Sequence, residues 1–211
     1  MSNIPRFIVF EGLDGAGKTT QIRLLAKHLE ELGEKVVLTA EPTAYESGRA
    51  LRAALSGKVK KTPCEMAVMF TEDRIAHNQN EENGIERLLK DGYIVISDRY
   101  YYSSLAYQGS ITDYKWVAEL NLDCPEIRKP DLCIFLDLSP EESMKRITAS
   151  RGEGEIEIYE TLDQLTRIRK TFLSVFDQLQ GDVNRGEQIR FIDASGTIEE
   201  VGERIYLAVL S

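Results

Sequence analysis

The sequence predicts an α/β fold in which a parallel sheet of about five strands carries helices on both faces. Apolar runs typical of buried strands alternate with segments whose apolar residues recur at helical spacing, and this order favours β-α repeats. A glycine-rich stretch, residues 12–19, joins the first run to the first helical segment. The 211 residues suffice for one such domain, and no repeat or linker divides the chain, so we expect a single domain over residues 1–211. The strand-like runs are Phe7–Phe10, Val36–Thr39, Tyr93–Ser97, Leu132–Leu136 and Ile189–Ile192.

Several helices have local signals. Ser139 followed by Pro140, and Thr197 followed by Glu200, are typical of capped helix starts. The segment after the glycine-rich stretch has one apolar helical face, formed by Ile22, Leu25, Ala26, Leu29 and Leu32. A core-facing stripe is predicted between residues 163 and 180, formed by Leu165, Ile168, Phe172, Val175, Phe176 and Leu179.

The glycine-rich stretch matches the phosphate-loop pattern G-x-x-x-x-G-K-[ST], and so predicts a P-loop NTPase fold. Glycines let backbone N–H groups converge on phosphate oxygens, and the N-terminus of the following helix adds partial positive charge. Lys18 can reach the β- and γ-phosphates, and Thr19 can offer its hydroxyl to Mg²⁺. The alternative is a glycine turn with an exposed lysine. The expected ATP-binding residues of this loop are Gly12, Leu13, Asp14, Gly15, Ala16, Gly17, Lys18, Thr19 and Thr20.

Composition excludes several classes of protein. A formal net charge of −9 argues against a general nucleic-acid binder, since those present a basic surface. Cys64, Cys124 and Cys133 have no metal-ligand spacing and suit reduced packing residues, and His28 and His77 are too scattered for a metal site. No secretory pattern opens the chain, and no apolar run approaches the ~18 residues of a membrane span. We therefore expect a cytoplasmic protein with neither nucleic-acid nor membrane partners.

A second chemical cluster follows the third strand-like run at Asp98-Arg99-Tyr100. An acidic residue at the carboxyl end of a parallel strand beside a phosphate loop can hold Mg²⁺, and the planar fork of Arg99 can clamp a phosphate. The alternative is a surface ion pair. Residues 100–109 that follow are dense in hydroxyls, aromatics and one amide, which suits a base and a sugar.

Together these segments resemble the thymidylate kinase family. The resemblance rests on Phe10 through Gln21, on Glu41-Pro42, on Phe70 with Arg74, and on Asp98 through Gln108. Further agreement comes from Lys129-Pro130-Asp131-Leu132, Leu136-Asp137 and Tyr159-Glu160. It covers nearly the whole chain, and residues 98–109 are its most specific part. The resemblance implies a homodimeric, Mg²⁺-dependent enzyme that moves the γ-phosphoryl group of ATP to dTMP, giving dTDP and ADP.

The resemblance also implies roles for individual residues. Asp14 would hold the 3′-hydroxyl of the acceptor, Phe70 would stack on thymine, and Tyr107 would lie beneath the sugar where a 2′-hydroxyl would project. Arg99 would bind the acceptor phosphate, and Arg151 would contact adenine or the donor phosphates. The expected acceptor-binding residues are Asp14, Glu41, Pro42, Arg52, Phe70, Arg74, Arg99, Ser103, Tyr107 and Gln108. The expected catalytic residues are Lys18, Arg99, Asp14 and Arg151, and the expected metal-binding residues are Thr19, Asp98 and Glu41. Two alternatives stay open: Phe70 as a core residue, and Arg49 in place of Arg52.

The chain departs from the family where an arginine usually meets the transferring phosphoryl group. Gly15 occupies the phosphate-loop position and Ile158 the lid position, which leaves Arg151 at the start of a short segment, about residues 151–158, expected to be either a lid or a solvated loop. The family's Arg-Glu-Pro is Ala40-Glu41-Pro42 here. The alternatives for function are a P-loop kinase for another nucleoside monophosphate and a weakly active nucleotide-binding protein. A GTPase is disfavoured because no Asn-Lys-x-Asp motif is present.

Overall fold

The computed structural model describes residues 4–151 and 161–211. Its sheet has five strands in the order β2-β3-β1-β4-β5, and every neighbouring pair is parallel. The strands are β1 Phe7–Gly12, β2 Val36–Ala40, β3 Ile94–Asp98, β4 Leu132–Asp137 and β5 Ile189–Asp193. All five predicted strands are confirmed, and with them the α/β architecture of a P-loop fold.

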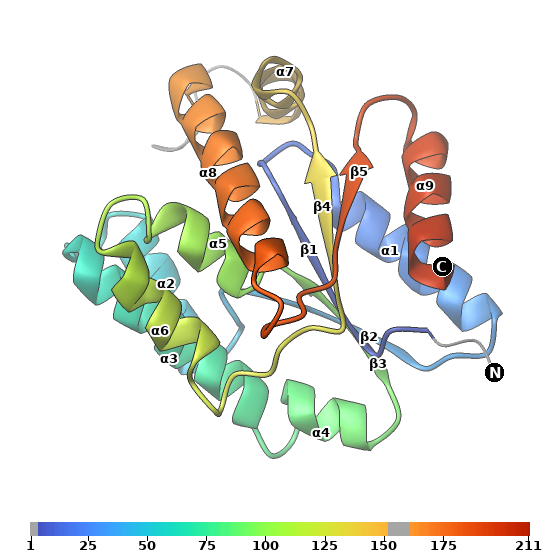
Figure 1. The fold of residues 1–211 in the computed structure, drawn as a ribbon, viewed down its shortest axis with the longest axis horizontal. Coiled ribbons are helices and arrows are strands. Elements are labelled where there is room, and N and C mark those ends of the chain that lie inside the picture. Colours follow the sequence, from blue (N-terminus) through green and yellow to red (C-terminus); the bar gives the residue numbers. More distant parts are fainter. Residues whose placement is uncertain (1–3, 152–160) are drawn as a thin grey trace.

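Helices cover both faces of the sheet, as Figure 1 shows with α1 and α9 on one side and α5 and α8 on the other. The helices of the described ranges are α1 Lys18–Glu31, α2 Glu46–Leu55, α3 Pro63–Gln79, α4 Ile85–Lys90, α5 Tyr101–Tyr107, α6 Tyr114–Leu122, α7 Pro140–Arg151, α8 Leu162–Gly181 and α9 Ile198–Leu210. Among these residues, no helix is long and apolar enough to cross a membrane.

The central strand β1 shows why the sheet has two cores. Phe7 and Val9 pack into the cluster that includes α5 and α8, whereas Ile8 and Phe10 pack into the cluster that includes α1 and α9. Successive side chains of a strand point to opposite faces, so a continuous apolar run fills both layers at once. The stripe predicted for α8 is also confirmed, because all six of its residues are buried.

The helix starts behave mostly as their caps predict. Thr197 and Glu200 form a reciprocal capping box at α9. Ser139 accepts a hydrogen bond from the backbone N–H of Glu142 at 3.2 Å, while the Glu142 carboxylate lies 3.4 Å from Arg146 Nε instead of returning to the cap. A further capping box at Thr62, which starts α3, was not predicted.

The prediction that Leu32 belongs to the apolar face of α1 is wrong. Its side chain is 55% exposed, and the helix ends one residue earlier, at Glu31. Gly33 follows with φ 89°, a left-handed conformation that closes helices. The periodicity therefore continued by chance one residue beyond the helix.

Candidate active site

The phosphate loop connects the carboxyl end of β1 to the first turn of α1. Gly17 has φ 90° and precedes α1, and Gly15 has φ 78°. A Cβ added at Gly15 would lie 2.8 Å from the Ser143 carbonyl oxygen, so α7 packs directly on the loop at this point. A side chain at position 15 therefore has no room here in this conformation.

Lys18 lies folded back over the loop that precedes it. Its Nζ donates to the carbonyl oxygens of Gly12 at 3.1 Å and Leu13 at 3.0 Å, and lies 3.9 Å from Asp14 Oδ1. The side chain is buried, and burial together with nearby Arg99 lowers the pKa of Lys18. The ammonium is thus held by neutral carbonyl groups of the loop. Charged phosphate oxygens would be stronger partners for it.

Thr19 and Asp98 meet where α1 begins and β3 ends. The hydroxyl of Thr19 donates to Asp98 Oδ2 at 3.1 Å. The described residues contain no cluster of three or more histidine, cysteine or acidic side chains that could hold a metal by themselves. A hydroxyl and a single carboxylate beside a phosphate loop fit Mg²⁺, which keeps waters and takes phosphate oxygens as its other ligands.

Arg99 stands at the centre of the site in an uncommon backbone conformation. Its φ is 70°, and its N–H donates to the Phe10 carbonyl at 2.9 Å. Its Nη2 lies 2.5 Å from Asp14 Oδ1, its Nη1 donates to Ser103 Oγ at 3.1 Å, and its Cζ lies 5.7 Å from the Tyr107 ring centroid. The structure thus brings together four of the predicted residues, from the phosphate loop, the end of β3 and α5.

Arg74 and Glu41 form a buried pair beside this group. Arg74 Nε and Nη2 lie 2.8 and 2.6 Å from Glu41 Oε2, and His77 Nδ1 lies 2.9 Å from Glu41 Oε1. Arg74 Nη1 donates to Ser104 Oγ at 3.2 Å and to Asn121 Oδ1. Within the described residues, the hydrogen bonds of Nε and Nη1 and the ion pair of Nη2 account for four of the five N–H groups of this guanidinium, which leaves one on Nη2.

This arrangement bears on the expected metal role of Glu41. Both of its carboxylate oxygens are engaged by cationic or N–H groups, and the side chain is buried. A metal ion at Glu41 would have to share these oxygens with Arg74 and His77. The metal role of Glu41 stays a prediction, and the geometry favours a role in orienting Arg74.

The Pro42 loop is held from α3 and α2. Asp73, 1% exposed, accepts hydrogen bonds from Thr43 N at 2.7 Å and Thr43 Oγ1 at 2.6 Å. Arg52 donates to the carbonyl oxygens of Pro42 at 2.7 Å and Thr43 at 2.5 Å, whereas Arg49 donates to that of Ala44. Arg52 is therefore tied closer to Glu41, which favours it over Arg49.

Phe70, Tyr107 and Gln108 complete the predicted acceptor side. Phe70 is half-buried and is in neither core cluster of the described residues, which favours a ligand-facing role over the core alternative. The Tyr107 ring packs edge-on against Phe172 at 6.0 Å. Gln108 is buried at the C-terminus of α5.

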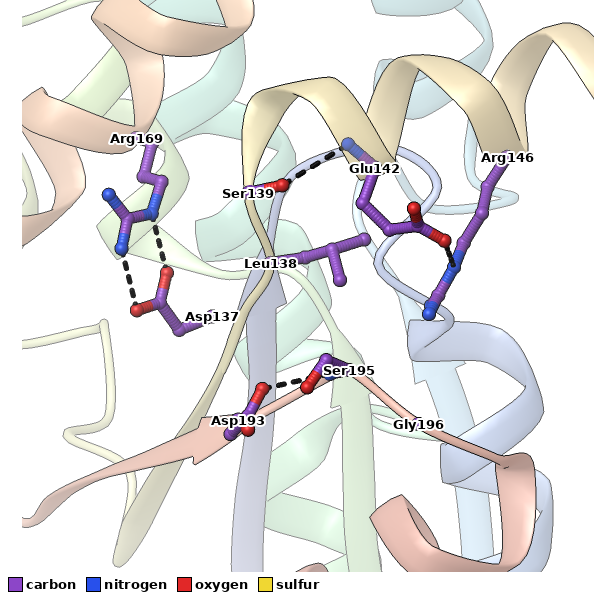
Figure 2. A pocket seen from close by; sticks show the side chains of 9 residues that line it. All are labelled: Asp137, Leu138, Ser139, Glu142, Arg146, Arg169, Asp193, Ser195 and Gly196. Atoms are coloured by element: carbon purple, nitrogen blue, oxygen red, sulfur yellow. Dashed lines mark hydrogen bonds and ion pairs between the residues drawn. The ribbon is translucent and has the colours of Figure 1, made fainter.

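A cavity of about 590 Å³ adjoins the phosphate loop, between the carboxyl ends of β4 and β5 and the start of α7 (Figure 2). Arg169 and Asp137 form a bidentate ion pair at its wall, with 2.7 and 2.9 Å between the paired atoms. Arg146 lies between the loop and β5: its Cβ would be 3.5 Å from a Cβ at Gly15, and its Nη2 donates to the Ala194 carbonyl at 3.2 Å. The lining residues are Asp137, Leu138, Ser139, Glu142, Arg146, Arg169, Asp193, Ser195 and Gly196.

The sequence analysis missed this cavity and two buried polar residues. Arg146 follows Glu142 by one helical turn, a spacing that places the two side chains on the same face of the helix predicted to start at Ser139. Asn121 and Glu11 gave no local signal, because their partners lie far along the chain. The Arg151 side chain and the rest of the expected lid, residues 152–158, lie outside the described residues.

Comparison with known proteins agrees with the geometry. The family model described as thymidylate kinase matches residues 10–205. The chain is 36% identical to a probable thymidylate kinase of Pyrococcus abyssi, over 96% of this chain and 95% of that protein. It is 36% identical to a thymidylate kinase of Caldicellulosiruptor saccharolyticus, over 95% and 93% of the two chains. It is 35% identical to a putative thymidylate kinase of Treponema pallidum, over 97% and 95%. With a phosphate loop, an Asp-Arg-Tyr turn beside it and these relatives, the chain belongs to the thymidylate kinase family.

Proposed function

We propose that this chain binds ATP at the phosphate loop and dTMP at the Asp98-Arg99-Tyr100 turn. As a thymidylate kinase, it phosphorylates dTMP to dTDP with ATP as donor. The placement of the ATP site and the dTMP site rests on the contact of Arg99 with Asp14. The two side chains are 2.5 Å apart, and their contact joins the acceptor-side turn to the donor-side loop. Two phosphates bound at these elements would be adjacent.

The proposed chemistry is alignment and charge neutralisation. Lys18 and the backbone N–H groups of the phosphate loop neutralise the donor, and Arg99 holds the acceptor phosphate in line with it. No general base is needed, because a phosphate monoester is already an anionic nucleophile near neutral pH. Thr19 and Asp98 would hold Mg²⁺, which supplies further neutralisation of the donor phosphates.

On the acceptor side, the fixed orientation of Arg74 supports reading of the base. Its remaining N–H requires a hydrogen-bond acceptor, which thymine provides with its O4 carbonyl at the position where cytosine carries an exocyclic amino group. Phe70 would stack on the base and Gln108 would hydrogen-bond its edge. Asp14 would hold the 3′-hydroxyl and Tyr107 would exclude a 2′-hydroxyl.

Other groups would complete the two binding sites. Arg52 would assist at the acceptor phosphate, and Ser103 would orient Arg99. The donor base would occupy the cavity beside Arg146, whose volume and polar lining suit a purine. Arg151, which follows from the same helix, would reach the donor phosphates and supply the transition-state charge.

We further propose that the enzyme is a homodimer. On α3, Val68 is 47% exposed beside half-buried Met66 and Met69, which gives an apolar surface that a second copy could cover. Light scattering coupled to size-exclusion chromatography tests this directly.

The function itself is tested by ADP release with ATP, Mg²⁺ and each deoxynucleoside monophosphate in turn, with identification of the product. Selective turnover of dTMP, with dUMP slower and dCMP far slower, supports the proposed acceptor site. Turnover of dTMP without preference over dCMP would contradict the role given to Arg74. Binding of ATP without turnover of dTMP would favour a nucleotide-binding protein.

A further inference from the structure

Glu11 is a buried carboxylate that the proposed chemistry does not use. It is the residue immediately before the phosphate loop, and its side chain is 0% exposed. Its Oε1 accepts hydrogen bonds from Tyr100 N at 2.9 Å and Ser103 N at 3.1 Å, and its Oε2 accepts one from Ser103 Oγ at 2.7 Å. All three donors belong to the segment that carries Arg99 into α5.

The hydrogen bonds around Ser103 have a fixed direction. A guanidinium only donates and a carboxylate only accepts, whereas a serine hydroxyl does both. Because Ser103 donates its hydroxyl proton to Glu11, its lone pairs face Arg99 Nη1, 3.1 Å away. Glu11 thereby determines which side of the Ser103 hydroxyl meets Arg99.

The same carboxylate also caps α5. Tyr100, the N-cap residue, makes no side-chain capping bond, and the first N–H groups of a helix have no partner within it. Arg99 just before it has φ 70°, which a non-glycine residue keeps only when its surroundings hold it. Glu11, which lies on β1, supplies that restraint. It accepts hydrogen bonds from the backbone N–H groups of Tyr100, just before α5, and of Ser103, in its first turn.

We propose that Glu11 is a positioning residue that orients Arg99 toward the acceptor phosphate through Ser103 and the backbone of the Tyr100–Ser103 turn. The inference rests on the proposed role of Arg99 in binding dTMP. It predicts that Glu11 governs the acceptor half of the reaction and leaves the donor half nearly unchanged, although Glu11 adjoins the phosphate loop in sequence.

The charges around Glu11 fit this role. Burial raises the pKa of Glu11 to about 7, against the opposing effects of Arg99, of its hydrogen bonds to Ser103 and Tyr100, and of Lys18. A buried carboxylate is costly, and glutamine has nearly the same shape. What glutamine lacks is a second hydrogen-bond acceptor for the Ser103 hydroxyl and a negative charge behind Arg99.

The test is Glu11→Gln, measured as kcat and KM for dTMP and for ATP. We expect kcat/KM for dTMP to fall at least tenfold, while KM for ATP stays within twofold. Ser103→Ala should reproduce the acceptor effect with the carboxylate intact. The double variant Glu11→Gln/Ser103→Ala should lower kcat/KM for dTMP little further than Glu11→Gln alone, because both changes break the same connection.

Glu187→Gln is the matched control. Glu187 is also buried and accepts hydrogen bonds from Tyr101 and Tyr102 on the same helix. It precedes β5, and in the part of the chain that the structure describes it makes no hydrogen bond or ion pair with a proposed site residue. It should leave the KM for dTMP unchanged.

Three results would overturn the inference: a kcat/KM for dTMP that falls less than threefold in Glu11→Gln, an equal rise in the KM for ATP, or an equal effect of Glu187→Gln. If Glu11→Gln does not fold, Ser103→Ala alone decides, and an unchanged KM for dTMP in that variant overturns the connection. Failure of the wild-type enzyme to phosphorylate dTMP would instead refute the proposed function, so the two failures are distinguishable.

Discussion

Arg99 and Asp14 form an ion pair across the site, with 2.5 Å between Nη2 and Oδ1. Arg99 comes from the end of β3 and Asp14 from the loop after β1, and the two strands are direct neighbours in the sheet. Strand order therefore brings together two residues that are 85 positions apart in the sequence.

Arg99→Lys should lower kcat/KM for dTMP by about 10²-fold or more, because one ammonium cannot replace a fork that reaches Asp14 and Ser103 at once. Steady-state kinetics with dTMP varied at saturating ATP measure the effect. Arg167→Lys, an exposed arginine on α8, is the control and should behave as wild type. Equal activities of the two variants would remove Arg99 from the acceptor site.

Arg74→Met should lower the free energy of unfolding by about 3 kcal/mol, because it leaves the Glu41 carboxylate buried without its main partner. The double variant Arg74→Met/Glu41→Leu should recover a large part of that loss, since both charges are then gone. Urea unfolding followed by circular dichroism measures both. A double variant less stable than Arg74→Met would show that the pair is not the source of the loss.

Gly15→Ala should be more destabilising than Gly17→Ala. Both glycines have positive φ, which costs alanine about 1 kcal/mol or more, but only at Gly15 would a Cβ meet a backbone carbonyl, at 2.8 Å. The described residues leave 4 Å of open space around a Cβ at Gly17. Thermal unfolding of the two variants measures the order, and the reverse order would contradict the close packing of α7 on the loop.

Glu11→Gln should gain stability relative to wild type as pH rises. The pKa of Glu11 is raised from 4.5 to about 7 by burial, so between these values the folded protein holds a proton that the unfolded chain has released. The free energy of unfolding of the wild type therefore falls through this window, by about 3 kcal/mol from this group, and levels off above it.

Glutamine does not titrate, so the stability difference between the variant and the wild type should shift by about 2 to 3 kcal/mol in favour of the variant between pH 5 and pH 8. Urea unfolding at both pH values measures it. Parallel pH dependence of the two proteins would contradict a titrating Glu11. Together with the kinetic test, this result would show a carboxylate that costs stability and aids acceptor binding.

The five strands and the position of the phosphate loop between β1 and α1 could be predicted from the sequence. Five apolar runs correspond to the five strands because parallel strands are buried on both faces, and β1 shows this with alternate residues in two cores. The Asp98-Arg99-Tyr100 turn was predicted to lie beside the phosphate loop, because both follow strands at the carboxyl edge of the sheet, where ligands bind.

What the sequence did not indicate depends on long-range pairing. The hydrogen-bond donors to Glu11 are 89 and 92 residues away in the sequence. A single glutamate within an apolar strand gives no local sign that its side chain is buried. Arg74 was predicted to read the base, but its buried partner Asn121 is 47 residues away on another helix. The cavity beside Arg146 depends on how the loops after β4 and β5 are placed, which periodicity does not determine.

The most direct test of the account is a crystal structure of the enzyme with dTMP and a non-hydrolysable ATP analogue. The account predicts the dTMP phosphate within hydrogen-bond distance of Arg99, the thymine carbonyl at the remaining N–H of Arg74, and adenine in the cavity beside Arg146. A dTMP phosphate bound away from Arg99, or thymine bound in that cavity, would contradict it.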